Sequence, residues 1–431
     1  MKIAFLVNDL HLSGGVNAIL KHASRLSRIH RHDVTIVVSG RGGWHEWRYS
    51  ELKDLDVQPL SSALNIEFDV AIATWWETIF NVGLLNSRAT VWFMQSLEDR
   101  FYSSGDPMQI LAQSAYAIKI PVITEAAWIR DFLVGLNPLR PVGYALNGID
   151  KEVFKPSTQQ LVSGSPLRIM IEGSLNAPNK GVRQCFEVLT HMEQPHEVVW
   201  VSPSGASPDG PEVTALTGPL TFEEMADAYR QSDVLLKLSR VEGMFGPPLE
   251  AFHCGATAVV APVTGAEEYI QHGYNSLVVA WDDVVGTARV LDRLATDADE
   301  LKMLKAGAVE TASRWISWEE STEVFESEIR RLSSDEFAIS SSEIRAQSSV
   351  LRSLRVPMRM MHENSVATHK IALGAFERID QLAVELNKRD QLLKELEHVH
   401  AEREWWDHFR RRLPIRVLMK IRRVWRRVRR R

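Results

Sequence analysis

Two series of short apolar runs, each alternating with helical stretches, dominate the sequence as far as Trp281. Runs of this kind are typical of buried β-strands, and strands that alternate with helices form parallel, doubly wound sheets. The first series therefore predicts one such sheet in a domain spanning residues 1–156. Its apolar runs lie at 3–7, 34–38, 70–73, 90–93 and 122–124, and a helical stretch covers 16–27.

The second series predicts another domain of the same type over residues 166–315. The segment 157–166 between the two series is rich in Ser, Gly and Pro, which is typical of a linker. The sequence thus predicts an α/β protein with two Rossmann-like sheets. The apolar runs of the second series lie at 168–171, 197–201, 234–238 and 258–261.

A helical extension is expected after the second domain. Residues 316–332 predict a helix that packs back on the body, and the Ser-rich residues 333–364 predict a flexible connection. Within 365–404, apolar residues recur at steps of three and four, interrupted by Arg389, which predicts a short coiled-coil-like helix that pairs with a partner or with a second copy. These residues are Ile379, Leu382, Leu386, Leu393 and Leu396.

Charge is distributed unevenly along the chain. Residues 410–431 hold twelve Lys or Arg and no acidic residue, which leaves 38 basic against 55 acidic residues elsewhere, a formal charge of −17. Within 405–431, apolar residues line one helical face and arginines occupy the others, as in helices that lie on anionic membranes. We expect 410–431 to bind an anionic membrane surface rather than to be a solvated tail or to bind nucleic acid, because no nucleic-acid-binding fold accompanies it. The apolar face comprises Val417, Leu418, Ile421, Val424, Trp425 and Val428.

The sequence predicts a cytoplasmic protein, peripheral on the inner face of the cell membrane. The apolar opening is stopped by Asn8 and is too short for a signal-peptide core, so a first strand is expected there. No run of about 18 apolar residues occurs. Cys185 and Cys254 lack CxxC or Cys/His spacing, which predicts reduced thiols rather than a disulfide or a metal site.

The segment from Leu238 to Glu250 places two carboxylates around a Gly- and Pro-rich loop directly after an apolar run. Ligands of doubly wound proteins bind at the carboxyl ends of strands, so a site is expected here. A carboxylate in the first turn of a helix, as expected for Glu250, can accept both hydroxyls of a ribose, while loop amides meet pyrophosphate oxygens. Glu242 would accept hydroxyls of a sugar. Taken singly, Glu250 is better explained as a helix-start acid and Glu242 as a solvated loop charge.

These residues belong to a longer pattern that closely resembles the carboxyl-terminal domain of glycosyltransferase family 4. In this pattern Glu242 and Glu250 are separated by seven residues, and the segments 253–257 and 265–270 follow. The resemblance covers about residues 1–330, strongly after 165 and loosely before. Further similarities lie at Gly14-Gly15, 147–150, 154–156, Glu172-Gly173, Lys180-Gly181 and 218–220.

The resemblance implies a GT-B fold, a nucleotide-diphosphate sugar as donor, retention at the anomeric carbon, and no required metal or cofactor. In that family the acid matching Glu250 binds the ribose, and the one matching Glu242 contacts the donor sugar. Lys180 matches the lysine that pairs with the diphosphate, where its charge would stabilise the leaving group. Lys180 and Glu242 are therefore the candidate catalytic residues, and the further candidate donor-binding residues are Gly14, Gly15, Gly173, Gly243, Phe245 and Gly246.

Glycines that follow apolar runs are candidates for close approach to the donor. Gly14 and Gly15 follow the first run, where they would let backbone amides reach the diphosphate at the start of a helix. Gly265 follows the run at 258–261 and is a candidate of the same kind. A plain turn explains each of these glycines as well.

Two features depart from the family pattern. Ser174 stands where many relatives have an arginine that helps to bind the diphosphate. Arg240 or Arg183 would take over that task, or Lys180 would act alone. The amino-terminal run that ends at Trp76 also lacks the histidine of many relatives, so nothing about the acceptor is implied from it.

The amino-terminal half supplies aromatic residues in place of that histidine. Aromatic faces can stack on the apolar faces of sugar rings, whereas packing in a core is the alternative. The pattern formed by Gln95, Glu98 and Tyr102 resembles bacterial rhamnosyltransferases of the same family, which implies a donor such as dTDP-rhamnose. The aromatic residues are Trp75, Trp76, Trp92 and Phe93.

The sequence therefore predicts a retaining hexosyltransferase that acts on a glycan or lipid-linked acceptor in the assembly of a cell-surface polysaccharide or lipopolysaccharide. One alternative is a nucleotide-sugar epimerase of the same two-domain shape, although such enzymes lack this pair of glutamates. Another is an inactive transferase-like scaffold recruited through its coiled coil, and Ser174 is the feature that favours it.

Overall fold

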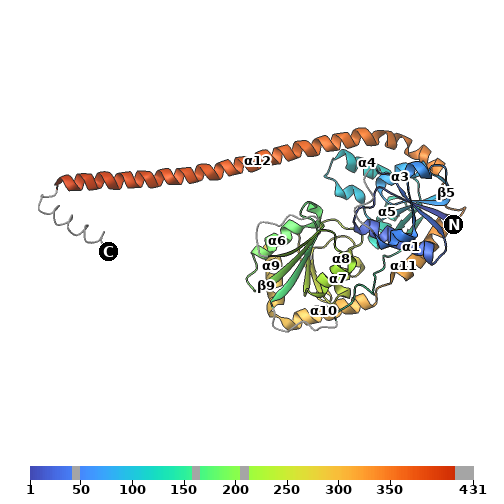
Figure 1. The fold of residues 1–431 in the computed structure, drawn as a ribbon, viewed down its shortest axis with the longest axis horizontal. Helices are drawn as coiled ribbons and strands as arrows, with labels where there is room; N and C mark the ends of the chain where they lie inside the picture. The colour runs from blue at the N-terminus through green and yellow to red at the C-terminus, as the bar shows by residue number, and fades with distance from the viewer. Residues whose placement is uncertain (41–48, 158–165, 204–212, 413–431) are drawn as a thin grey trace. The chain divides into compact units, whose positions relative to one another are not determined.

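The computed structural model describes residues 1–40, 49–157, 166–203 and 213–412, and for much of 369–412 it describes the backbone only. Contacts divide the chain into two units, Met1–Arg359 and Met360–Arg431. The first unit contains two parallel sheets with helices around them, as the two series of apolar runs predict (Figure 1). The predicted linker core at 158–165 lies outside the described residues.

The amino-terminal sheet has seven strands within the described ranges, in the order β3-β2-β1-β4-β5-β6-β7. All are parallel, and β1 pairs on one side with β2 and on the other with β4, so the strand order reverses there. Such a reversal opens a crevice at the carboxyl ends of the strands, which is where ligands of this fold bind. The strands are β1 (Lys2–Val7), β2 (Asp33–Val38), β3 (Asp56–Pro59), β4 (Glu67–Ala73), β5 (Asn86–Met94), β6 (Val122–Thr124) and β7 (Val142–Tyr144).

Helices cover both faces of this sheet, which explains why its strands are apolar on both sides. The first helix begins after Ser13, whose hydroxyl accepts a hydrogen bond from the Val16 amide at 3.1 Å. The helices are α1 (Gly14–Arg28), α2 (Leu60–Ala63), α3 (Trp76–Val82), α4 (Pro107–Ala115) and α5 (Ala127–Leu136), with short 3-10 turns η1 (Ser50–Asp54) and η2 (Glu98–Phe101).

The second sheet has six parallel strands among the described residues, in the order β10-β9-β8-β11-β12-β13. It repeats the reversal at its centre, because β8 pairs with both β9 and β11. The strands are β8 (Leu167–Glu172), β9 (His196–Ser202), β10 (Thr214–Thr217), β11 (Val234–Lys237), β12 (Thr257–Val260) and β13 (Ser276–Val278). The helices are α6 (Val182–Thr190), α7 (Phe222–Arg230), α8 (Gly246–His253), α9 (Val284–Thr296) and α10 (Ala298–Ser313), with 3-10 turns η3 (Pro178–Lys180) and η4 (Ala266–Glu268).

After the second sheet the chain returns to the amino-terminal half. Helix α11 (Trp318–Leu332) lies beside α1, although almost three hundred residues separate them in sequence (Figure 1). The Thr322 hydroxyl lies 3.1 Å from Nδ1 of the buried His22, and Phe325 is fully buried in the same core. The return therefore ties both halves into one unit.

The predicted flexible connection over 333–364 is wrong for residues 341–359. They form the start of α12 (Ser341–Arg412) and pack on the amino-terminal half. Ile344 is fully buried, and the Arg345 side chain donates to the Gly83 carbonyl at 2.6 Å. The Ser-rich composition conceals this helix because buried serines such as Ser348 donate back to the helix carbonyl one turn earlier.

Unit 2 contains the remainder of α12 as far as Arg412. The side chains of the five residues that predict a coiled coil lie outside the described residues, as do residues 413–431 of the basic segment. Both assignments therefore stay predictions. No helix in the described part of the chain is long and apolar enough to cross a membrane.

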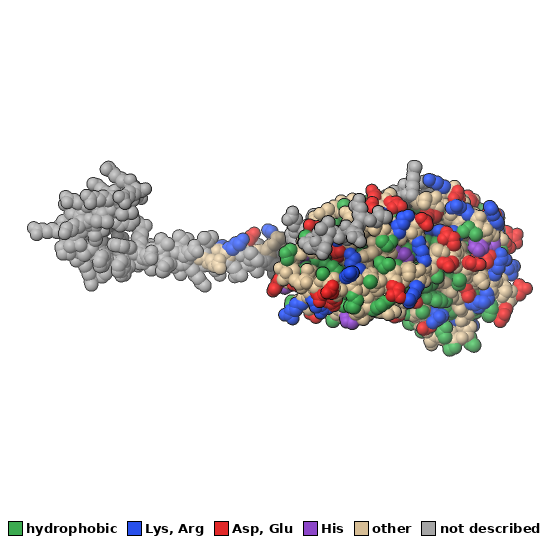
Figure 2. Space-filling model, turned by 90° about the horizontal axis from the view of Figure 1, so that it is seen from below, with side chains coloured by type: hydrophobic (Ala, Val, Ile, Leu, Met, Phe, Trp, Pro, Cys, Tyr) green, Lys and Arg blue, Asp and Glu red, His purple; other side chains and the backbone are tan. Residues whose placement is uncertain are grey.

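Both signs of charge are present on the surface of unit 1. Acidic and basic side chains are interspersed with apolar ones over the face shown in Figure 2. On this face neither sign of charge gathers into a separate patch.

Candidate functional site

The loop from Leu238 to Phe245 joins β11 to α8 at the carboxyl edge of the second sheet. Helix α8 begins at Gly246 and has two prolines in its first turn, where the fixed φ of proline suits a helix start. Glu250 therefore lies in the second turn of α8, not in the first turn as expected. Because the helix dipole acts mainly on the terminal turn, Glu250 is not explained as a helix-start acid.

The Glu250 carboxyl group is held by one neighbour from α7. The Tyr229 hydroxyl donates to its Oε2 at 3.2 Å. Burial, and next the negative charge of Glu172, raise the pKa of Glu250 to about 7. When ionised, this group can accept two hydroxyl hydrogen bonds at once.

The two candidate catalytic residues lie together. Lys180 Nζ donates to both carboxylate oxygens of Glu242 at 2.9 Å, and Glu242 is buried whereas Lys180 is one-third exposed. Gly181 makes this contact possible, because it has a φ of 68° and a Cβ there would lie 2.1 Å from the Leu238 carbonyl oxygen. The turn bearing Lys180 therefore packs against the end of β11, as only glycine permits.

A second lysine, which the sequence does not single out, lies beneath this pair. Lys237 is the last residue of β11 and is almost fully buried; its Nζ donates to the Glu172 carbonyl at 3.1 Å and forms an ion pair with the Glu172 carboxylate. Burial alone would raise the pKa of Glu172, but the ammonium groups of Lys237 and Lys180 hold it below its ordinary value. A charged residue that ends an otherwise apolar strand is the signal that could have identified Lys237.

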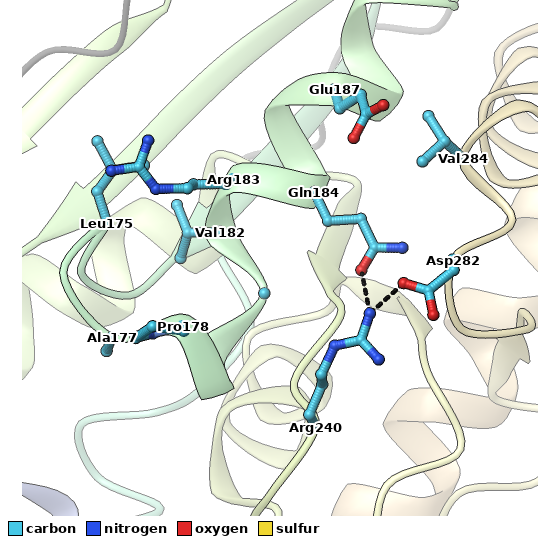
Figure 3. A pocket seen from close by; sticks show the side chains of 11 residues that line it. Leu175, Ala177, Pro178, Val182, Arg183, Gln184, Glu187, Arg240, Asp282 and Val284 are labelled. Carbon is cyan, nitrogen blue, oxygen red and sulfur yellow. Dashed lines mark hydrogen bonds and ion pairs between the residues drawn. The ribbon is translucent and has the colours of Figure 1, made fainter. Parts of the chain in front are cut away.

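The two arginines considered as substitutes for the missing family arginine, Arg183 and Arg240, line a cavity next to the turn that bears Lys180 (Figure 3). The cavity has a volume of about 400 Å³ and is also lined by Pro178 and Gly181. The Arg240 amide donates to the Asn179 carbonyl at 2.8 Å, so its backbone lies beside the turn that bears Lys180, while its guanidinium is paired with Asp282.

Two of the candidate glycines, Gly243 and Gly265, lie where segments of the chain approach closely. A Cβ on Gly243 would lie 1.8 Å from the Gln95 carbonyl oxygen of the amino-terminal half, and one on Gly265 would lie 2.2 Å from the Gly243 oxygen. Gly265 also has a φ of 86°, which favours glycine. These glycines therefore let the loop pass between the two halves.

The remaining candidate donor-binding residues differ in their surroundings. Gly173 has a φ of 131° directly after β8. Phe245 is fully buried, so it supports the loop by packing rather than by facing a ligand. Gly14 opens α1, and a Cβ there would meet no atom within 4 Å, whereas a Cβ on Gly15 would lie 3.0 Å from Gln95 Oε1.

Most of the aromatic residues predicted to line the amino-terminal cleft belong to the core instead. Trp76, Trp92 and Phe93 are fully buried. Trp92 and Phe93 lie in β5, whose two faces are covered by helices, and Trp76 begins α3, which packs on the same sheet. Trp75 alone of the four keeps some exposure, and it stacks on Phe101 with ring centroids 6.0 Å apart.

Glu98 and Tyr102 also serve the fold. The Glu98 carboxyl group is almost fully buried and accepts a hydrogen bond from the Trp76 amide at 2.6 Å, at the start of α3. Burial holds the pKa of Glu98 well above its ordinary value. The Tyr102 ring packs edge-on against Trp76. The structure therefore explains these two residues without a sugar.

Sequence reasoning also missed Glu125, which directly follows β6. Its carboxyl group is buried and accepts hydrogen bonds from Gln95, Asn147 and the Met244 amide. A signal for it exists, because Glu125 follows the apolar run at 122–124 in the same way that Gln95 follows the run at 90–93.

The carboxyl edge of the second sheet thus combines two lysines with three glutamates. Ammonium groups can balance phosphate oxygens, and carboxylates can accept from sugar hydroxyls. Among the side chains that the structure describes, no group of three or more His, Cys, Asp or Glu could hold a metal ion.

Known proteins share this domain and fold. Residues 166–297 match the model of the family described as glycosyl transferases group 1. The D-inositol 3-phosphate glycosyltransferase of Stackebrandtia nassauensis is 28% identical over 222 residues, which is 45% of this chain and 50% of that protein. The serotype-specific mannosyltransferase WbdA of Escherichia coli is 33% identical over 102 residues, 24% of this chain and 12% of that protein. This chain therefore spans half or less of the length of these two relatives.

Solved structures extend the likeness to both halves. The crystal structure of Anabaena HepE in complex with UDP and glucose superposes with a TM-score of 0.62 at 14% identity, covering 77% of this chain and 100% of that one. At this identity the likeness concerns the fold alone. It confirms the expected GT-B arrangement of two Rossmann-like domains.

Proposed function

Because residues 166–297 match the glycosyl transferases group 1 family and the chain has the GT-B fold, we propose that this protein is a retaining glycosyltransferase with a nucleotide-diphosphate sugar as donor. The observation that carries the proposal is the arrangement of Lys180, Glu242 and Glu250 at one edge of the second sheet. No step in it uses a metal or a cofactor.

The donor would lie along this edge from ribose to sugar. Glu250 accepts the two ribose hydroxyls, and Glu242 accepts hydroxyls of the sugar. Lys180, one-third exposed, is the cation available to the diphosphate, where its charge stabilises the leaving group as the sugar departs. Lys237 is buried and forms an ion pair with Glu172. It would therefore contribute positive charge near the donor without contacting it.

The identity of the transferred sugar is a narrower proposal. One curated relative is named for mannosyl transfer, which favours a hexose donor, whereas the name of another mentions D-inositol 3-phosphate and no transferred sugar. Rhamnosyl transfer has less support, since Glu98 and Tyr102 are explained by the packing around Trp76.

We call the loop from Leu238 to Phe245 the donor loop. The acceptor would lie along a row of side chains that leads away from this loop. Trp128 Nε1 donates to the Gly243 carbonyl at 2.9 Å, and the Arg100 guanidinium lies 5.2 Å from the Trp128 ring centroid. Next in the chain, Phe101 is exposed and stacks on Trp75. Aromatic faces and a cation suit a glycan, including one that carries phosphate.

We further propose that the chain works at the inner face of the cell membrane, in the assembly of a polysaccharide or lipopolysaccharide on a lipid-linked acceptor. The support is the basic segment 410–431, whose charges would hold the enzyme at an anionic surface where such acceptors are presented. Pairing of the helix over 365–404 with a partner or a second copy is a separate proposal from the same sequence pattern.

Release of nucleoside diphosphate tests the proposal. The purified chain is mixed with UDP-, GDP- and dTDP-sugars, with membrane extract as acceptor, and the expected result is release from one of them that Glu250→Gln strongly reduces. An epimerase would instead convert the donor sugar without releasing the diphosphate. A scaffold would do neither, and the proposal would then be wrong.

A further inference from the structure

Glu125 is a buried titratable residue that the proposed chemistry does not use. It follows β6 at the carboxyl edge of the amino-terminal sheet and is 6% exposed. Burial raises its pKa to about 7 even though it accepts three hydrogen bonds. Burying a carboxyl group destabilises the folded state unless protein donors satisfy its hydrogen-bonding capacity.

The three donors to Glu125 come from three different parts of the molecule. Gln95 Nε2, from the loop after β5, lies 3.3 Å from Oε2, and Asn147 Nδ2 lies 2.8 Å from the same oxygen. The Met244 amide, from the donor loop of the second half, lies 3.3 Å from Oε1. One carboxyl group therefore joins the donor loop to the amino-terminal half.

Gln95 extends this connection to the glycine pair at the start of α1. Its Nε2 also donates to the Gly15 carbonyl at 3.1 Å. Its own carbonyl oxygen lies so close to Gly243 that no side chain fits there. Gln95 and Glu125 thus connect the loop-to-helix junction at Gly14–Gly15 with the Gly243–Met244 turn. The proposed function places these two segments, called the donor-facing loops below, on either side of the donor.

Asn147, which donates to the Glu125 carboxyl group, lies where the chain crosses between the two halves. The Asn147 carbonyl accepts from Trp315 Nε1 at 2.9 Å, and the Ile149 amide donates to the Ile316 carbonyl at 3.2 Å. The two chain passages between the halves therefore run side by side at this point. A change in the angle between the halves would alter the contacts of Asn147.

We propose that Glu125 is a positioning residue that fixes the Gly243–Met244 turn against the amino-terminal half, so that both donor-facing loops are assembled together. The inference rests on the proposed function. It places Glu125 outside direct contact with the donor, because its two oxygens are occupied by protein donors.

Glu125→Gln tests the proposal, since the amide has the same size but lacks the charge and one acceptor oxygen. The value of kcat/KM for the nucleotide sugar should fall about tenfold or more. The affinity for free UDP, GDP or dTDP, whichever the wild type binds, should stay within about twofold by calorimetry, because Glu250 and Lys180 are untouched. Gln95→Ala should also lower kcat/KM without weakening nucleoside diphosphate binding. It provides the test if Glu125→Gln does not fold.

Glu326→Gln is the matched control. Its carboxylate is also buried and joins distant segments, since it accepts from His32 Nε2 at 2.9 Å and pairs with Arg330, but it touches neither donor-facing loop. Its kcat/KM should fall less than about threefold. Unchanged turnover in Glu125→Gln and Gln95→Ala, or an equal loss in Glu326→Gln, would overturn the inference. Failure of the wild type to bind any nucleoside diphosphate would instead contradict the proposed function.

Discussion

At the scale of single residues, the three glutamates at the carboxyl edge of the second sheet differ in how their negative charge is balanced. Glu242 is paired with Lys180 and Glu172 with Lys237. Among the described residues, the only hydrogen bond to the Glu250 carboxyl group comes from Tyr229. Glu250 is therefore the one of the three that has no ion pair among the described residues.

Replacing Glu250 should alter stability in a direction set by its pKa. The folded state binds a proton on Glu250 up to about pH 7, whereas the unfolded state loses it near the ordinary pKa. The free energy of unfolding therefore falls as the pH rises between those values. Glu250→Gln should be more stable than the wild type at pH 8 by up to about 3 kcal/mol, an upper value because the side chain keeps some exposure.

Denaturant unfolding at pH 5 and pH 8 measures this difference for both proteins. Glu125 titrates in the same range, but it is present in both and cancels from the comparison. If the free energy of unfolding at pH 8 were larger for the wild type than for Glu250→Gln, the Glu250 carboxylate would be stabilised by contacts that the structure does not contain.

Lys180→Ala should lower kcat more than it weakens donor binding, because the lysine charge matters most as the diphosphate departs. The loss of one such electrostatic contact in a transition state is typically about a hundredfold in kcat. Steady-state kinetics with the preferred donor gives both quantities. Lys155→Ala removes an exposed lysine paired with Glu152 and should change neither; a mutant of Lys180 that behaves like this control would rule out its assigned role.

At the scale of elements, the donor loop passes between the two halves at Gly243, where only glycine fits. Gly243 has no space for a side chain, whereas a Cβ on Gly246, at the start of α8, would meet nothing within 4 Å. Gly243→Ala should therefore destabilise unit 1 by a few kcal/mol or separate the halves, and Gly246→Ala should leave the melting temperature nearly unchanged. Calorimetric melting and small-angle scattering measure both effects, and equal behaviour of the two variants would refute this packing.

The same loop shows how far the sequence predicts structure. The apolar runs locate both sheets because a buried parallel strand needs apolar residues on both faces. The predicted start of α8 is wrong, since prolines that open a helix also mark turns. The sequence shows that Lys237 ends an apolar run and that Glu125 follows one, but it does not show their partners. Glu172 and Asn147 are distant along the chain, and only the fold brings them near.

Composition is a weaker guide than contacts. The Ser-rich segment after 333 suggests a flexible connection, yet residues 341–359 gain tertiary contacts that outweigh their weak helical pattern. Trp76 and Trp92 are both aromatic residues that suggest a ligand cleft. Trp92 lies in strand β5 of the covered sheet and Trp76 begins helix α3, which packs on that sheet, so both are buried. In both cases packing between distant elements decides the outcome.

At the scale of the whole molecule, the basic charge of the chain is concentrated at one end and the acidic charge in the rest. Attraction of residues 410–431 to an anionic surface is screened over about 8 Å at physiological ionic strength. Membrane binding would therefore depend on salt and on the anionic content of the membrane. The donor-site residues all precede 290 and do not depend on it.

Deletion of residues 410–431 should release the protein from anionic vesicles and leave turnover on a short soluble acceptor nearly unchanged. Cosedimentation with vesicles of varied anionic content, at low and high salt, provides the measurement. If the truncated chain sediments as well as the full chain, the membrane contact lies elsewhere, and the amino-terminal half is the next place to search.

The proposed function depends above all on nucleotide-sugar binding through Glu250 at the carboxyl edge of the second sheet. Calorimetric titration of the wild type and of Glu250→Gln with UDP-, GDP- and dTDP-sugars measures this binding. We expect one donor to bind the wild type and its affinity to fall about tenfold or more in the variant, since charge-assisted hydrogen bonds to two ribose hydroxyls are weakened. Equal affinity of that donor for the two proteins would show that Glu250 does not hold the ribose.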